Sequence, residues 1–61
     1  MNRKYVYIVT TAESGVATVV QHCKDAAEAM QASAPLPTGG CEGPVPLDLY
    51  PIGKTFNIEG D

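Results

Sequence analysis

A proline- and glycine-rich run, APLPTGGCEGPVP at residues 34–46, constrains the fold of this chain more than any other feature. It holds four of the 5 prolines, three of the 6 glycines and one of the 2 cysteines. Proline lacks a backbone donor and disfavours helix before itself, so a helix must end before this run. We interpret the run as a connector. Because long loops in small domains are often functional, a secondary binding loop is the alternative, with contacts at Leu36, Thr38 and Glu42.

Two segments before the run have the composition of β-strands. KYVYIVTT at residues 4–11 and VATVVQHC at residues 16–23 are rich in β-branched and aromatic side chains. Ser14-Gly15 lies between them and offers a tight turn, with a glycine that accepts positive φ. The sequence therefore predicts a β-hairpin.

A short helix is predicted from Ala26 to Ser33. Asp25 can cap its first turn, and Glu28 follows three residues later, as in a capping box. Alanine, the residue with the highest helix propensity, dominates the segment. Pro35 then ends the helix.

A third strand is predicted over PVPLDLYPI at residues 44–52, where apolar and polar residues alternate. Its prolines cannot donate to a ladder, so we place it at a sheet edge. A short fourth strand can follow from Thr55 to Ile58. The element order predicts a single α+β domain over residues 1–61, a small antiparallel sheet of order 2-1-3 with one helix on one face.

Alternation along the strands divides their side chains between two faces. We expect the helix to cover the face that carries Val6, Ile8 and Val19, together with Val45, Leu47 and Leu49 of the third strand. Met30 is the one bulky side chain of the helix, so it is expected to be buried there. If so, Met30→Ala costs about 2–5 kcal/mol.

The opposite face is expected to be open, because a single helix covers only one side of a sheet. An exposed apolar patch usually marks an interaction site, and tyrosine suits such sites because it is large, rigid and polar at its tip. This face is therefore the predicted surface for a protein partner or for a second copy in a homodimer. Its residues are Tyr5, Tyr7, Val9, Val20, His22 and Tyr50.

Composition narrows the classes of binding partner and the cellular compartment that we expect for this chain. The formal net charge is −3, and the 4 basic residues are scattered, so a footprint for nucleic acid is missing. The apolar run near the N-terminus is too short for a signal-peptide core or a membrane span. We therefore expect a cytoplasmic protein that binds neither nucleic acid nor membrane. In a reducing cytosol its two cysteines stay as thiols, whereas in a secreted protein they could pair.

No motif for catalysis or metal binding is complete. His22, Cys23 and Cys41 form the one candidate metal set, but structural zinc takes four ligands, and adjacent strand residues point to opposite faces. The segment PIGKT resembles the end of a phosphate-binding loop, yet the first glycine of that motif is replaced by Asp48. We expect no enzyme activity, no metal and no cofactor.

In size, acidity and layout the chain resembles the small accessory proteins of bacteriophages. The resemblance rests on YVYIVTT, a hairpin, ATVVQHCKDAAEAM, a proline loop and LDLY. Some of these proteins inhibit host RNA polymerase or, as anti-CRISPR proteins, CRISPR effector complexes. The resemblance implies a non-enzymatic inhibitor that docks on a host protein complex in the cytosol. Two alternatives stay open: a small metal- or ligand-binding domain that uses Cys23, Cys41 and His22, and a structural or assembly subunit.

Overall fold

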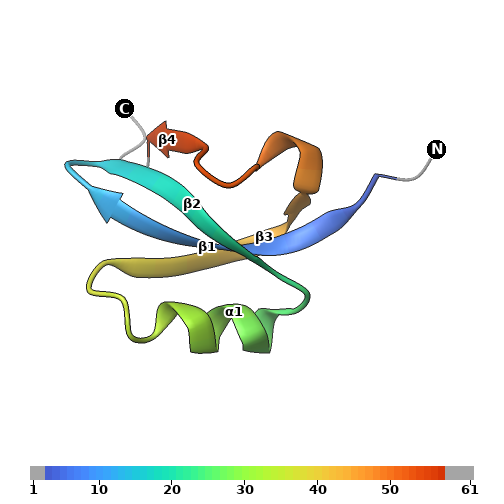
Figure 1. Ribbon diagram of the computed structural model, residues 1–61, viewed down its shortest axis with the longest axis horizontal. Coiled ribbons are helices and arrows are strands. Elements are labelled where there is room, and N and C mark those ends of the chain that lie inside the picture. Colours follow the sequence, from blue (N-terminus) through green and yellow to red (C-terminus); the bar gives the residue numbers. More distant parts are fainter. Residues whose placement is uncertain (1–2, 58–61) are drawn as a thin grey trace.

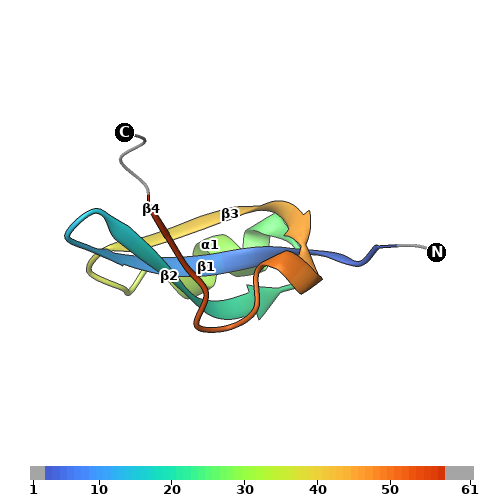
Figure 2. The ribbon, with the colours of Figure 1, turned by 90° about the horizontal axis from the view of Figure 1, so that it is seen from above.

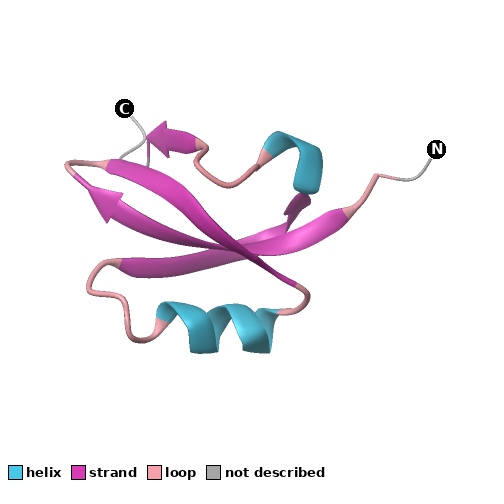
Figure 3. Cartoon of the chain, in the orientation of Figure 1, coloured by secondary structure: helices cyan, strands magenta, loops and turns pink. Residues whose placement is uncertain are grey.

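The computed structural model describes residues 3–57 as an antiparallel sheet with one helix (Figures 1 and 3). The sheet has 4 strands in the order β3-β1-β2-β4. This confirms the predicted α+β class and the order 2-1-3, and it adds the short fourth strand beside β2. Ile58, the predicted end of that strand, lies outside the described residues. The elements are β1 (Tyr5–Glu13), β2 (Val16–Cys23), α1 (Ala26–Ser33), β3 (Gly39–Pro46), a 3-10 turn η1 (Leu47–Leu49) and β4 (Thr55–Asn57).

Both local signals in the first half of the chain are confirmed. Ser14 and Gly15 have φ of 55° and 79° and join β1 to β2 as a two-residue turn whose twist suits a hairpin. At the start of α1, Asp25 Oδ1 accepts a hydrogen bond from the Glu28 amide at 2.8 Å. The Glu28 carboxylate accepts from the Lys24 amide at 3.2 Å, one residue earlier than in a standard capping box.

The helix is the crossover between two parallel strands. β2 and β3 each pair antiparallel with β1, so they run parallel to each other on either side of it. Two parallel strands need a long connection, and α1 supplies it. It lies below the sheet and packs mainly on β1 and β3 (Figure 1).

The third strand begins earlier in the chain than predicted and overlaps the predicted segment at residues 44–46 alone. β3 spans Gly39–Pro46 and therefore takes up most of the run that we interpreted as a connector. The alternating segment after it forms a 3-10 turn instead of a strand, and Tyr50 N–H donates to the Leu47 carbonyl at 3.2 Å. Tertiary context overrides the low strand propensity of glycine here, because pairing with β1 satisfies the backbone of the segment.

Glycine is required where β3 begins. A methyl group at Gly39 would overlap the Ser33 carbonyl oxygen and lie 2.8 Å from Leu36 Cβ. The missing side chain therefore lets the end of α1 approach the sheet closely. At Gly40 a methyl group would come no closer than 3.4 Å, to Thr10 Oγ1.

The helix covers the opposite face of the sheet from the one that we expected. Val6, Ile8 and Val19 form one core cluster with Val45, Leu47, Tyr50 and Phe56, on the side away from α1. Val9, Cys23 and Ala29 form the other, with Tyr7, Ala32 and Leu36 packed against it. The helix therefore covers the odd-numbered side of β1. The segment of residues 47–57, which we call the strap, crosses the opposite face (Figure 2).

Met30 is not the buried residue of the helix. Its side chain is 62% exposed, while Ala29 is fully buried between α1 and the sheet. Alanine at the contact lets the helix axis lie close to the strands, and no bulky side chain fits between them. The expectation that Met30 fills the core is therefore wrong.

Substitution at Gly39 tests the close approach of α1 and β3. Gly39→Ala is expected to lower the free energy of unfolding by about 1–3 kcal/mol, because the added methyl group overlaps the Ser33 carbonyl. Gly40→Ala is the matched control and should change stability much less. Urea unfolding followed by circular dichroism measures both, and equal losses would contradict the close approach.

A second pair of variants tests the face of α1. Met30→Ala should change the unfolding free energy by less than about 0.5 kcal/mol, because Met30 is exposed. Ala29→Leu should destabilise by about 1–3 kcal/mol through overpacking. The reverse order of effects in thermal unfolding would restore Met30 to the core.

Candidate binding surface

The six residues predicted to share an open face lie on two sides of the sheet. Val9 is fully buried under α1, and Tyr7 packs half-buried against the same cluster. His22 and Tyr50 lie on the opposite side, where the strap covers them in part. The prediction of one open tyrosine face is therefore wrong, because the chain covers both faces of its sheet.

Polar and aromatic contacts hold the strap on its face of the sheet. His22 Nε2 lies 2.6 Å from the Tyr50 carbonyl oxygen, so it donates its proton to that acceptor. The Tyr50 ring meets the Phe56 ring edge-on, with centroids 5.9 Å apart and planes at 87°. Backbone bonds join Val19 to Lys54 and Gly53, each at 2.8 Å. His22 and Tyr50 thus have structural contacts in place of the exposed positions predicted for them.

A β-bulge in β2 exposes Val20. Val9 pairs with Gln21 and Thr10 with Val19, so Val20 is the extra residue of β2. A bulge re-aims side chains and strengthens the local twist. Val20 is 41% exposed, and Gln21 beside it is exposed as well.

Two large apolar side chains are exposed on the helix side of the molecule. Tyr5 belongs to the odd-numbered side of β1 and is 56% exposed, and Met30 lies on α1. We call this pair the helix-side surface. The helix adds exposed small apolar residues and no basic residue in its last turn. These residues are Ala26, Ala27 and Ala34.

The predicted secondary binding loop has mainly structural contacts. Leu36 is half-buried and packs against the cluster under α1. Thr38 Oγ1 accepts a hydrogen bond from the Ala12 amide at 3.1 Å, which ties the loop to the end of β1. Glu42 is exposed on β3, opposite Ile8 in the register. Among the three, Glu42 is the one whose side chain is free of a described contact with the fold.

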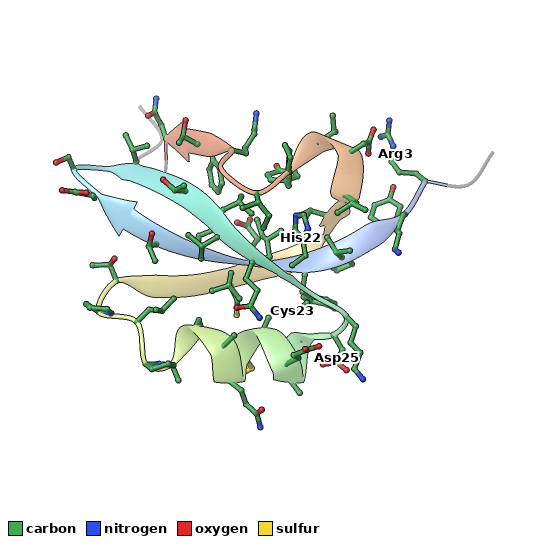
Figure 4. All side chains as sticks on the ribbon, viewed as in Figure 1. Arg3, His22, Cys23 and Asp25 are labelled. Carbon is green, nitrogen blue, oxygen red and sulfur yellow. The ribbon has the colours of Figure 1, made fainter. Side chains whose placement is uncertain are left out.

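The two cysteines and His22 are held apart by the strands. His22 and Cys23 point to opposite sides of β2 (Figure 4). Because β1 lies between β2 and β3, the Cα atoms of Cys23 and Cys41 are about 10 Å apart or more, too far for a disulfide. Both cysteines are free. Within residues 3–57, no three His, Cys, Asp or Glu side chains gather into a group that could hold a metal ion.

The two thiols differ in environment. Burial raises the pKa of the Cys23 thiol, and the carboxylates of Glu28 and Asp25 raise it further, against an opposing hydrogen bond from Gln21. The neutral thiol of Cys23 is therefore favoured in the folded state. Cys41 is exposed on β3.

The positions that sequence reasoning missed are Met30 and the backbone of β3. A spacing signal for the helix was present: positions 29, 32, 33 and 36 follow the i, i+3, i+4, i+7 pattern of a buried helix side and its extension. It was hidden because these residues are mostly small. For β3, the prolines did indicate an edge strand, but no residue type marked residues 39–43 as its first part.

Thiol chemistry tests the two environments. In the native protein at neutral pH, Ellman's reagent should modify Cys41 rapidly and Cys23 at least about tenfold more slowly, because burial and a raised pKa keep its thiolate scarce. In denaturant both should react. Cys41→Ser and Cys23→Ser variants assign the two phases, and equal native rates would contradict the burial of Cys23.

No family model, no curated protein and no solved structure matches this chain. Within residues 3–57, no helix has the length and apolar character needed to cross a bilayer. A functional proposal must therefore rest on the surface of the chain itself.

Proposed function

We propose that this chain is a non-enzymatic protein-binding module, an inhibitor of the type carried by bacteriophages, which docks on a host protein complex and blocks it. The observation that carries the proposal is the helix-side surface. Tyr5 and Met30 expose apolar side chains there, although the exposed side of a surface helix is ordinarily polar. The size, acidity and element order shared with small bacteriophage accessory proteins support the inhibitor class.

The chemistry of the helix-side surface suits a protein partner. Methionine is flexible and polarisable, so it adapts to the shape of an apposed surface. Tyrosine buries a large area at a low cost in conformational entropy. The exposed alanines let a partner approach the helix backbone closely. Around this surface the exposed acidic side chains Asp25 and Glu28 favour a partner with basic residues at the rim.

A residue on the opposite side of the molecule supplies a matched control variant. Ile52 lies on the strap and is 57% exposed, close to the value for Met30. The same change at both positions therefore alters net charge equally at similarly exposed apolar side chains, on opposite sides of the sheet.

Affinity purification from a bacterial host tests the docking surface. Wild-type protein and Ile52→Lys should enrich the same partner. The amount of this partner recovered with Met30→Lys should be at least about tenfold lower, as for a central interface residue. Calorimetry with the purified partner should give the same ranking. Circular dichroism checks that both variants fold. Loss of the partner with Ile52→Lys but not with Met30→Lys would overturn the assignment, as would the absence of any partner.

A further inference from the structure

β3 is the long free edge of the sheet. Within residues 3–57 no strand pairs with its outer side, whereas the other edge, β4, is a strand of 3 residues. The residues from Cys41 to Pro44 are exposed. An edge strand presents unpaired backbone donors and acceptors to any chain that can match them.

The register shows which backbone groups of β3 point outward. Leu47 N–H donates to the Lys4 carbonyl at 2.8 Å, and Ala12 N–H donates to Thr38 Oγ1 at 3.1 Å. The backbone groups of even-numbered β1 residues therefore face β3. Gly40 and Glu42 pair with two of these residues, Thr10 and Ile8.

Alternation along an antiparallel ladder then turns the groups between these pairs outward. Cys41, opposite Val9, directs both its N–H and its C=O away from β1. The planar peptide groups on either side direct the Gly39 C=O and the Gly43 N–H the same way. The outer edge thus carries the row Gly39 C=O, Cys41 N–H, Cys41 C=O, Gly43 N–H.

This row is complementary to itself. Read in the reverse direction, as in an antiparallel second copy, its donors and acceptors exchange places. Cys41 would exchange two hydrogen bonds with Cys41 of the second copy, and each Gly39 carbonyl would accept from the other chain's Gly43 amide. Four hydrogen bonds would form about a two-fold axis that passes between the two Cys41 residues.

Neighbouring backbone groups fix this register. Pro44 and Pro46 have no N–H, so the row of donors ends at Gly43. A shift of the second copy by two residues in one direction places Val45, whose N–H faces β1, opposite the Gly39 carbonyl. The same shift in the other direction places Gly39 opposite the Cys41 carbonyl, although the Gly39 N–H already donates to the Leu36 carbonyl at 3.2 Å. Charge agrees with the same register, because Glu42, the one charged residue of β3, then lies opposite Gly40 of the second copy and not opposite its own equivalent.

We propose that two copies of this chain associate through antiparallel pairing of their β3 edges, centred on Cys41. The pairing joins two sheets of 4 strands into one continuous sheet, with both α1 helices on the same side. This surface is distinct from the helix-side surface, so the proposal goes beyond the docking function and does not depend on it. The occupant of the edge is a second copy, because the donor and acceptor row matches itself.

Nuclear magnetic resonance on a mixed sample tests the register directly. Labelled and unlabelled chains are mixed, and isotope-filtered spectra should show an intermolecular contact between Gly40 Hα and Glu42 Hα, which face each other in a non-hydrogen-bonded pair. Sedimentation should give the dimer mass at about 1 mM protein. A monomer at that concentration, or a dimer without this Hα contact, would overturn the proposal.

A substitution at the centre of the row supplies an independent test. Cys41→Pro removes the central donor without touching a bond to β1 and should weaken dimerisation at least about tenfold. Cys41→Ser keeps the backbone donor and should dimerise as the wild type does, in the presence of reductant. Dimerisation of folded Cys41→Pro with wild-type affinity contradicts the edge pairing. If Cys41→Pro does not fold, the Hα contact in the wild type decides.

Discussion

The structure depends on β1, which supplies side chains to the cores on both faces of the sheet. Val6 and Ile8 point to one face, and Tyr7 and Val9 point to the other. A chain of 61 residues has little surface to bury, and a sheet with one bare face would leave half of β1 in water. Both faces must therefore be covered by segments outside the hairpin, and α1 and the strap are arranged to do so.

The two covers differ in kind. On one face α1 packs through Ala29, and the glycine at position 39 lets the end of the helix come close to the sheet. On the other face the strap has no regular helix of its own, so it depends on the His22 bond to the Tyr50 carbonyl, the Tyr50–Phe56 contact and the short pairing of β4. An ion pair between Arg3 and Asp48, 3.6 Å apart and exposed, adds little to this (Figure 4).

Local signals predicted the local structure well. Asp25 and Glu28 indicated the start of α1, Pro35 its end, and Ser14-Gly15 the hairpin, because caps and tight turns depend on neighbours in the sequence. The assignment of the two faces was not accessible in the same way. Alternation along β1 separates Val6 from Tyr7, but it does not say which of them lies under the helix, and the strap that covers the other face has no distinctive sequence signal.

The predictions of the third strand and of the candidate site were wrong for related reasons. The alternation of Leu47 and Leu49 with polar residues favoured a strand, but β3 forms from glycines and prolines that gain their stability from β1. Because residues 47–52 of the strap were interpreted as part of the third strand, the face that they cover was expected to be open, and the tyrosines were assigned to one site. Val20 is exposed through a bulge, which no residue type in VATVVQHC indicates.

The side of β1 that faces the helix decides which side chains enter each of the two cores. Nuclear Overhauser contacts between methyl groups measure this in solution. The structure predicts contacts from the Val9 methyl groups to the Ala29 methyl group, and from the Ile8 and Val19 methyl groups to residues of the strap such as Phe56. Contacts from Ile8 to Ala29, with none from Val9, would contradict it.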